Sequence, residues 1–368
     1  MLEEHAVIGE PVDCSGVIGT EAFDRLDFPR ETIRDHLKAL EFVSPSGRRV
    51  AFHPQRTLAY IVDRAAFDRA LAERARGAGS TIVTNARVMA VEPASDGVQV
   101  SLDHGGDPVE VWAQAVVLAG GPRYRFQQQL GMGTPTKYLR TIQGEVEVPR
   151  GGIPQMFLGS RVAPGSFAWW LPVKSDHGYR AKVGVSAVGD SQRAFQAFLD
   201  LLQDQGYLDR NDVPSRAWMI PIAPLPTTYS HRVVAVGDAA GQTKPTTGGG
   251  LYYGSLCAKI AAEVLVEGFR CGDLSAAFLA RYEARWRQVL SRELATAHRF
   301  RRMFEQLSDA EIEQLFDLIS QDGLIRYLEG EANFDWHRRT ILQGVFRLPS
   351  VATLLARLRR KQSAGSLS

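Results

Sequence analysis

Residues suited to binding a phosphate-containing ligand follow a short apolar run late in the chain. The β-branched run Val233–Val236 is typical of a buried strand, and Gly237–Asp238 ends it. A loop rich in Gly, Thr and Pro follows, and an apolar helical pattern starts at Leu251. Backbone N–H groups at a helix N-terminus attract anions, while the carboxylate of Asp238 accepts hydrogen bonds from hydroxyl groups. The glycines 248–250 let a flat ligand approach the backbone closely.

The same segment carries an extended motif, G-D-A-A-G at residues 237–241 and P-T-T-G-G-G-L-Y-Y at residues 245–253. A ligand with hydroxyl groups, phosphates and a ring that becomes anionic on reduction fits such a segment, and FAD is such a ligand. The motif resembles that of flavoproteins with the p-hydroxybenzoate hydroxylase type of fold. It most closely resembles the geranylgeranyl reductase family, which saturates isoprenoid double bonds. A Gly-rich turn without a ligand is the alternative.

Two earlier segments resemble parts of the same family that lie near the cofactor. The chain start resembles the end of a second strand, whose acidic residue, Glu3, would bind the adenosine ribose. It continues into a P-x-x-C-x-G loop with Cys14 and Gly16. Asp63 caps a predicted helix, and the family arginine that matches Arg64 lies near the cofactor.

A second flavin fingerprint is predicted at residues 115–131. Residues 119–121 read Ala-Gly-Gly where the family usually has A-D-G, so the contact of the aspartate is missing. The close backbone approach of the two glycines is retained. The resemblance implies the following cofactor-binding residues: Glu3, Cys14, Gly16, Arg64, Val88, Gly120, Gly237, Asp238, Pro245, Gly248, Gly249 and Gly250.

Residues 167–172, Phe-Ala-Trp-Trp-Leu-Pro, resemble the aromatic substrate motif of the family, Y-x-W-x-F-P. The family motif leads on to G-x-G, of which only Gly184 is present here. An apolar wall of this kind suits a long polyprenyl tail, whereas ordinary sheet core is the alternative. The resemblance implies substrate-binding roles for Phe167, Trp169, Trp170 and Pro172.

The chemistry that the resemblance implies is hydride transfer from reduced FAD to one carbon of an isolated C=C bond, followed by addition of a proton to the other carbon. Such a bond has no carbonyl to accept charge, so the site must be dry and must hold the bond close to the donor. Cys14 and Tyr252 are the candidate catalytic residues. An inert thiol at Cys14 and simple packing of Tyr252 or Tyr253 are the alternatives. We expect NAD(P)H or a ferredoxin as electron donor, and no metal.

Two other classes of function remain open from the sequence. Another flavoprotein of the same fold, a monooxygenase or a quinone-coupled dehydrogenase, is one of them. The other is a remnant without catalytic activity, which would bind lipid but no flavin. Oxygen incorporation would favour the monooxygenase, and the colour of the purified chain separates an enzyme from a remnant.

The turn that binds the pyrophosphate of FAD in this family, G-x-G-x-x-G, occurs nowhere in the sequence. Met1 falls inside the segment expected to be the second strand. The first βαβ unit would therefore be lacking, which predicts an exposed sheet edge. A recorded start that is too late, a truncated product that binds FAD weakly and a partner chain that supplies the unit are the three explanations.

Composition predicts a globular protein that binds no nucleic acid. The 368 residues are 45% hydrophobic and 23% charged, with a net charge of +2. The three cysteines, Cys14, Cys257 and Cys271, show no paired spacing, which favours a reducing compartment. No signal peptide and no apolar run of transmembrane length are visible, so we expect a cytoplasmic protein.

The order of patterns predicts an α/β (α+β) fold with an inserted sheet. A Rossmann-like FAD-binding domain, without its first βαβ unit, is expected at residues 1–134 and again at 230–268. An antiparallel substrate sheet is expected at 135–229 and a helical region at 269–368. We also expect a helix near residues 30–40, a strand at 81–83 and a β-meander with turns at 95–97 and 105–107.

The segment 336–360 combines apolar positions with many arginines. A basic amphipathic helix can lie on an anionic membrane surface, so peripheral membrane contact is one interpretation. A helix packed on the body of the protein, with its basic face in solvent, is the other. Small isoprenoid or prenyl lipid molecules are the expected substrates, and the oligomeric state does not follow from the sequence.

Overall fold

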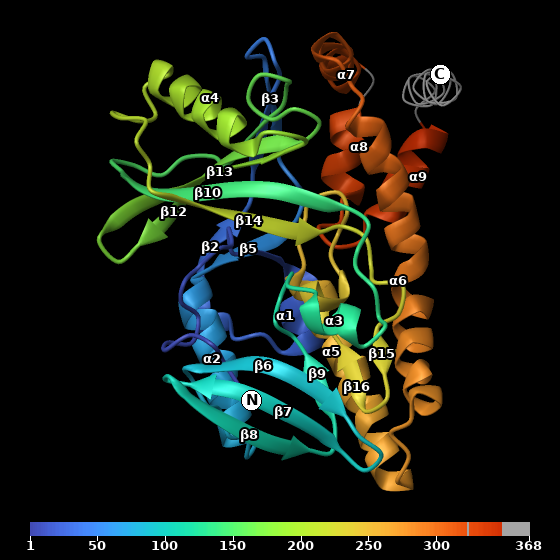
Figure 1. The fold of residues 1–368 in the computed structure, drawn as a ribbon. Helices are drawn as coiled ribbons and strands as arrows, with labels where there is room; N and C mark the ends of the chain where they lie inside the picture. The colour runs from blue at the N-terminus through green and yellow to red at the C-terminus, as the bar shows by residue number, and fades with distance from the viewer. Residues whose placement is uncertain (322–323, 348–368) are drawn as a thin grey trace.

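The computed structural model describes residues 1–321 and 324–347. A large sheet and two of the smaller sheets lie at opposite ends of the molecule, and the long helix α6 (Ala276–Phe304) runs along both (Figure 1). The third small sheet lies next to the large one. This mixed arrangement confirms the predicted α/β (α+β) class. The predicted domain boundaries stay a prediction.

The large sheet has seven strands in the order β14-β10-β13-β12-β11-β3-β4. Helix α4 (Ser191–Asp204) covers one face, where Phe195, Phe198 and Leu202 pack against strand residues such as Val183 and Val185. The strands are β3 (Leu40–Val43), β4 (Arg49–Phe52), β10 (Tyr138–Val148), β11 (Gln155–Phe157), β12 (Phe167–Ser175), β13 (Gly178–Ala187) and β14 (Ser215–Pro221). An antiparallel sheet in this part of the chain was predicted, but the pairing of β3 with β11 was not.

The prediction of a helix near residues 30–40 is wrong. A single 3-10 turn, η1 (Arg30–Thr32), leads into strand β2 (Ile33–Leu37). Strand β2 pairs with β5 (Ala59–Val62), which also pairs with β1 (Val17–Gly19). Tertiary pairing thus overrides the local helical pattern. Helix α1 (Thr20–Leu26) was missed, whereas α2 (Arg64–Gly77) begins after the predicted Asp63 cap, whose carboxylate accepts a hydrogen bond from Ala66 N.

Two of the small sheets lie at the other end of the molecule (Figure 1). The meander of β6 (Ala86–Pro93), β7 (Val98–His104) and β8 (Asp107–Ala113) has the two predicted turns. Strand β16 (Val233–Ala235) lies parallel to β9 (Val116–Leu118) and antiparallel to β15 (Tyr229–Ser230). Leu2 forms a parallel bridge with Val83, so the predicted strand at 81–83 is reduced to one bridge.

Two long helices support the strand β16. Helix α5 (Leu251–Cys271) packs against α6 and against the 3-10 turn η2 (Gly237–Ala240), which follows β16. Their shared core contains the fully buried Trp286, Tyr282 and Tyr253. A short helix, α3 (Arg125–Gln129), follows β9. This core fixes the direction in which the N-terminus of α5 points.

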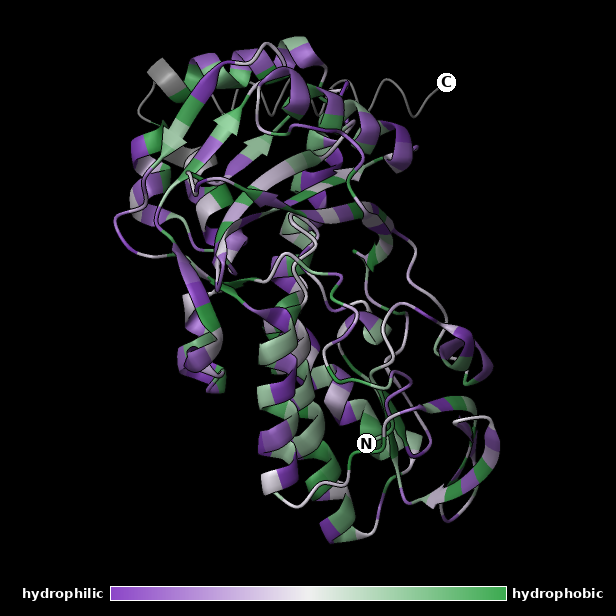
Figure 2. Ribbon diagram, turned by 90° about the vertical axis from the view of Figure 1, so that its left-hand side faces the viewer, coloured by the Kyte–Doolittle hydropathy of each residue, from purple (hydrophilic) through white to green (hydrophobic). Residues whose placement is uncertain are grey.

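The C-terminal region is helical, as predicted, through α7 (Asp309–Gln321), α8 (Leu324–Glu331) and α9 (His337–Arg347). The predicted basic helix at 336–360 lies only in part within the described residues, which end at residue 347. The long helices interleave hydrophilic and hydrophobic residues along their length (Figure 2). In the part of the chain that the structure describes, no helix is both long enough and apolar enough to span a bilayer.

Candidate functional site

The predicted strand, loop and helix come together at Asp238. Gly237 has a φ of +63°, and a Cβ on Gly254, in the first turn of α5, would lie 3.0 Å from the Gly237 Cα. A side chain at residue 254 would therefore require the backbone at Gly237 to shift. A Cβ on Gly250 would lie 2.8 Å from Oδ1 of Asp238, so the carboxylate is directed toward the start of α5.

The carboxylate of Asp238 accepts no hydrogen bond from any residue that the structure describes. Burial raises the pKa of Asp238 to about 6, although the nearby charge of Arg64 acts in the opposite direction. Helix α5 begins at Leu251, and its N-cap residue Gly250 has no side chain to cap it, so the first N–H groups of the helix are available to a ligand. An unpaired carboxylate beside free N–H groups fits the hydroxyl groups and the electron-accepting ring of FAD.

Backbone hydrogen bonds within the loop before α5 stabilise it, and the side chain of Lys244 connects it to the C-terminal segment. Lys244 N donates to Gly249 O at 3.0 Å, and Gly248 N donates to Lys244 O at 2.8 Å. The side chain of Lys244 passes under the loop, because a Cβ on Gly249 would lie 2.6 Å from its Cε. Its Nζ donates to Asp335 Oδ1 at 2.8 Å and to Phe334 O at 3.1 Å.

A second contact joins this loop to the same C-terminal segment. The Nε2 of His337 lies 2.9 Å from Phe334 O, so it carries the proton, and Nδ1 accepts from the hydroxyl of Thr246 at 2.7 Å. Burial lowers the pKa of His337 to about 4, which agrees with a neutral ring. The sequence did not predict Lys244, Asp335 and His337 as site residues, because a loop lysine and two residues about ninety positions later carry no joint sequence signal.

The predicted Cys14, Gly16 and Arg64 lie together. Gly16 has a φ of +77°, a Cβ there would lie 2.6 Å from Val62 O, and its N–H donates to Cys14 Sγ at 3.3 Å. Arg64 forms two hydrogen bonds with Asp68. Burial alone would lower the pKa of Arg64, but Cys14 and Asp68 raise it overall. The charge of Arg64 opposes the rise that burial causes in the pKa of Asp238.

The other predicted cofactor residues lie in the surrounding segments. The carboxylate of Glu3 accepts hydrogen bonds from His5 N at 2.9 Å and lies 2.7 Å from Nδ1 of His5. Val88 packs against the cluster that contains β9 and β16. A Cβ on Gly120, just after β9, would meet no atom within 4 Å, and Pro245 is buried. Roles for these residues stay predictions.

The predicted aromatic wall is divided between two faces of strand β12. Trp169 lies in the groove left by Gly184 and donates from Nε1 to Gln143 Oε1 at 3.2 Å. It packs in a small apolar cluster, here called the β12 cluster, of Val17, Ile61, Trp169, Leu171 and Val173. Trp170 points to the opposite face and packs under α4, with its ring 5.2 Å from that of Tyr207.

Alternation along a strand explains this division. Phe167 lies on the face of Trp169, and their ring centroids are 5.9 Å apart. Pro172 is buried on the face of Trp170. The geometry therefore favours a core role for Trp170 and Pro172, and we keep the β12 cluster with Phe167 as the candidate substrate wall.

Tyr252 is buried in the core behind the site. Its hydroxyl donates to Glu21 Oε1 at 2.6 Å and accepts a hydrogen bond from Arg25 at 3.1 Å. Its ring packs on Trp336, and burial raises the pKa of Tyr252 to about 12. Of the two interpretations that the sequence left open, this geometry favours packing.

Known proteins resemble this chain over most of its length. A family model described as lycopene cyclase protein matches residues 49–335. A digeranylgeranylglycerophospholipid reductase of Methanocaldococcus jannaschii is 28% identical over 338 residues, which are 88% of this chain and 85% of that protein. Digeranylgeranylglycerophospholipid reductase 2 of Methanothermobacter thermautotrophicus is 28% identical and covers 96% of this chain and 91% of its own length.

Solved structures share the fold. A geranylgeranyl bacteriochlorophyll reductase-like protein of Thermoplasma acidophilum matches with a TM-score of 0.83 at 20% identity, over 97% of this chain and 92% of that chain. A p-nitrophenol 4-monooxygenase of Pseudomonas putida matches with a TM-score of 0.65 at 17% identity, over 89% of each chain. The chain belongs to the lycopene cyclase protein family, and the resemblance to geranylgeranyl reductases that its sequence predicts is confirmed.

Proposed function

We propose that this chain is an FAD-dependent oxidoreductase that reduces C=C bonds of an isoprenoid chain. The names of its relatives support this activity, since several are digeranylgeranylglycerophospholipid reductases. The observation that carries the proposal is the unpaired carboxylate of Asp238, which faces the uncapped N-terminus of α5 across the glycines 248–250.

The residues of the chain would hold FAD and exclude water. Asp238 would accept hydrogen bonds from its hydroxyl groups, and the N-terminus of α5 would stabilise negative charge on its ring. When bound and reduced, FAD supplies a hydride to one alkene carbon, and the other carbon takes a proton. The β12 cluster would hold the alkene in an apolar environment.

Cys14 is the proposed polar group nearest to the reacting bond. Its loop is fixed by Gly16 and lies beside Arg64, so the thiol has a defined place at the edge of the site. It would influence delivery of the proton. NAD(P)H or a ferredoxin is the proposed electron donor, and peripheral membrane contact through the basic C-terminal segment is proposed for an isoprenoid lipid substrate.

The test is reduction of a defined lipid under anaerobic conditions. The purified chain is incubated with FAD, dithionite and detergent-dispersed digeranylgeranylglycerophospholipid. The masses of the lipid products are then measured by mass spectrometry. The proposal expects a gain of two hydrogens for each saturated bond, and loss of that gain in Asp238→Ala. Flavin binding with incorporation of oxygen, but without saturation, would indicate a monooxygenase. Failure to bind flavin at saturating FAD would indicate a remnant.

A further inference from the structure

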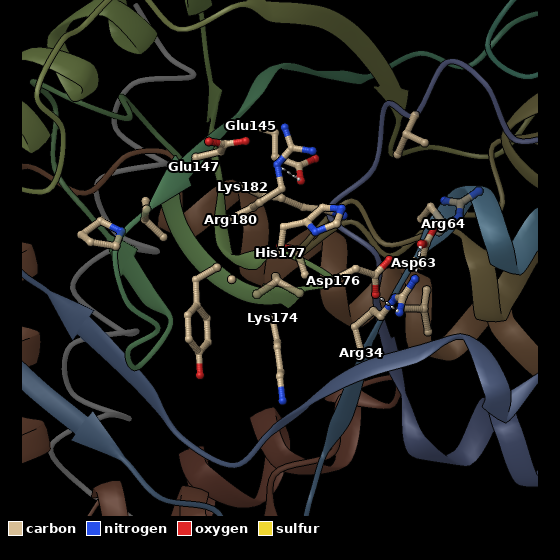
Figure 3. A pocket seen from close by; sticks show the side chains of 18 residues that line it. Arg34, Asp63, Arg64, Glu145, Glu147, Lys174, Asp176, His177, Arg180 and Lys182 are labelled. Atoms are coloured by element: carbon tan, nitrogen blue, oxygen red, sulfur yellow. Dashed lines mark hydrogen bonds and ion pairs between the residues drawn. The ribbon is translucent and has the colours of Figure 1, made fainter.

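A second polar region adjoins the loop that carries Cys14 and Gly16, here called the cysteine loop. A cleft of about 640 Å³ lies between the ends of β10, β12 and β13 on one side and β5 with the start of α2 on the other. Figure 3 shows charged side chains of both signs around it, with Lys182 and Arg64 among them. Its outer part is formed by the exposed turn between β12 and β13, which carries His177.

Most charged groups of this cleft neutralise one another. Arg34 lies 3.0 Å from Asp63 and 3.0 Å from Asp176. Arg180 lies 3.2 Å from Glu145. These ion pairs leave two charged side chains of the rim, Lys174 and Glu147, both exposed, which solvent screens.

Lys182 differs from the other cations of the cleft because it is buried. It is 7% exposed, and its Nζ donates to Ser15 O at 3.0 Å and to Cys14 O at 3.3 Å. Among the described residues, no carboxylate lies within ion-pair distance of this Nζ. Burial lowers the pKa of Lys182, while Cys14 and Glu145 oppose this effect only in part. A buried cation with carbonyl partners alone is poorly compensated.

Arg64 adds a second positive charge at the same end of the cleft. Its two bonds to Asp68 leave Nε buried, and Nε has no hydrogen-bond partner among the described residues. The charges of Arg64 and Lys182 repel each other, which lowers the pKa of Lys182 further. The inner end of the cleft therefore presents two cations, the buried Lys182 and the partly buried Arg64, of which only Arg64 has a carboxylate partner. This excess of positive charge favours an anionic ligand.

An apolar cluster of side chains adjoins this end of the cleft. Val173 lines the cleft and also belongs to the β12 cluster, in which it packs with Trp169 and Leu171. Val62 and Val12 line the same cleft. An elongated molecule with one anionic end and an apolar chain would match two cations that lie beside an apolar cluster.

We propose that Lys182 and Arg64 bind a phosphate group of the isoprenoid substrate, with the chain of that substrate directed along the β12 cluster. The inference rests on the proposed isoprenoid substrate and names the group that anchors it. It requires no flavin, so it is tested separately from the reduction.

Binding of three probes to the purified chain without added FAD tests the proposal. Farnesyl phosphate, farnesol and inorganic phosphate are titrated by calorimetry at a detergent concentration below micelle formation. We expect farnesyl phosphate to bind at least about tenfold more tightly than farnesol, because charge-assisted hydrogen bonds form only with the phosphate. This comparison uses the wild-type chain and does not depend on a variant that folds.

Variants then assign the preference to Lys182. Lys182→Met should remove the difference between farnesyl phosphate and farnesol, whereas Lys182→Arg should keep most of it. Lys174→Met, at the exposed rim, is the matched control and should keep it fully. Thermal unfolding of each variant verifies that it is folded.

Several results would overturn the proposal. They are equal binding of farnesol and farnesyl phosphate, an unchanged preference in folded Lys182→Met, and loss of farnesyl phosphate binding when saturating FAD is added. Inorganic phosphate that binds as tightly as farnesyl phosphate would overturn the assignment to a lipid headgroup and give the site to free phosphate. A chain that prefers farnesyl phosphate but saturates no bond would support this site and contradict the proposed reduction.

Discussion

Lys244 and Asp335 form a buried ion pair, 2.8 Å from Nζ to Oδ1, that ties the loop in front of α5 to the segment before α9. Both side chains are at most 4% exposed, and Lys244 also lies 4.3 Å from the ring centroid of Phe334. The loop that faces the proposed cofactor is therefore held by residues from the far end of the described chain.

Breaking this buried pair should lower the free energy of unfolding more than breaking an exposed ion pair does. Lys244→Met or Asp335→Asn leaves one buried group without its partner and should lower the free energy of unfolding by about 3–5 kcal/mol. The double variant Lys244→Met with Asp335→Leu should recover most of that loss, since neither charge remains. Denaturation with urea measures all three.

The exposed pair of Arg285 and Glu267, with two hydrogen bonds of 2.8 and 2.7 Å, is the matched control. Arg285→Met should cost no more than about 1 kcal/mol, because solvent screens an exposed pair. A double variant at the buried pair that is as unstable as the single variants would contradict the assignment.

The carboxylate of Asp238 should lower the stability of the chain without FAD and strengthen the binding of FAD. Its pKa in the folded chain is about 6 against an ordinary 3.8, so the folded state binds the proton more tightly than the unfolded state. Stability of the chain without FAD should therefore fall as the pH rises from 3.8 to about 6. Asp238→Asn should remove this loss and be more stable at neutral pH, yet bind FAD at least about tenfold more weakly.

Thermal unfolding as a function of pH and quenching of flavin fluorescence measure these two effects. Asp96→Asn, on the exposed turn between β6 and β7, should change neither. Unaltered FAD affinity in Asp238→Asn would argue against the proposed cofactor contact.

His337 should have the opposite effect on the pH dependence of stability: it should make the chain less stable as the pH falls. Its pKa is about 4 in the folded chain and 6.5 ordinarily, so the unfolded state binds more protons between these values. Stability that depends on His337 is thus lost as the pH falls from 6.5 toward 4. His337→Gln should be less stable at neutral pH and show a flatter decline, measured by the melting temperature from pH 7 to pH 4. An unchanged slope in this variant is the contrary result.

Trp169 and Trp170 should differ in what their loss affects. Trp170→Ala removes a 5% exposed ring from the core under α4 and should cost about 3–5 kcal/mol of unfolding free energy. Trp169→Ala should cost less and chiefly weaken binding of the isoprenoid chain. Urea denaturation and farnesol binding, measured on both variants, test this difference. A Trp170→Ala variant that is stable but has lost farnesol binding would reverse the assignment.

The cysteine loop offers a test of backbone geometry. Gly16→Ala places a Cβ 2.6 Å from Val62 O at a φ of +77°, so it combines strain with overlap. Gly47→Ala meets the same kind of strain at a φ of +87° but no atom within 4 Å. The control should lose about 1–2 kcal/mol of stability and Gly16→Ala distinctly more, measured by urea denaturation. Equal losses would show that the overlap is relieved by movement of the loop.

Local motifs predicted much of the region around Asp238, whereas long-range pairing decided the rest. The strand β16, its Gly-Asp end and the glycines before α5 follow from neighbouring residues, so the sequence was sufficient. The prediction of a helix at residues 30–40 failed because β2 pairs with β5, and β3 pairs with the distant β11 as well as with the neighbouring β4.

Side-chain direction was the second limit. A six-residue motif does not reveal which face of the strand helix α4 covers, and therefore which of Trp169 and Trp170 belongs to the core. Likewise, Lys182 and Lys244 look like ordinary surface lysines in the sequence. Only the packed structure shows that each is buried and which groups surround it.

The most direct test of the account is reoxidation of the bound flavin by substrate in the absence of oxygen. The chain is supplied with FAD, reduced by dithionite under anaerobic conditions, freed of excess reductant and mixed with digeranylgeranylglycerophospholipid. The account predicts that the absorption of oxidised flavin returns as lipid bonds become saturated, and that Asp238→Ala shows neither change. Flavin that stays reduced until oxygen is admitted, with the lipid unaltered, would contradict it.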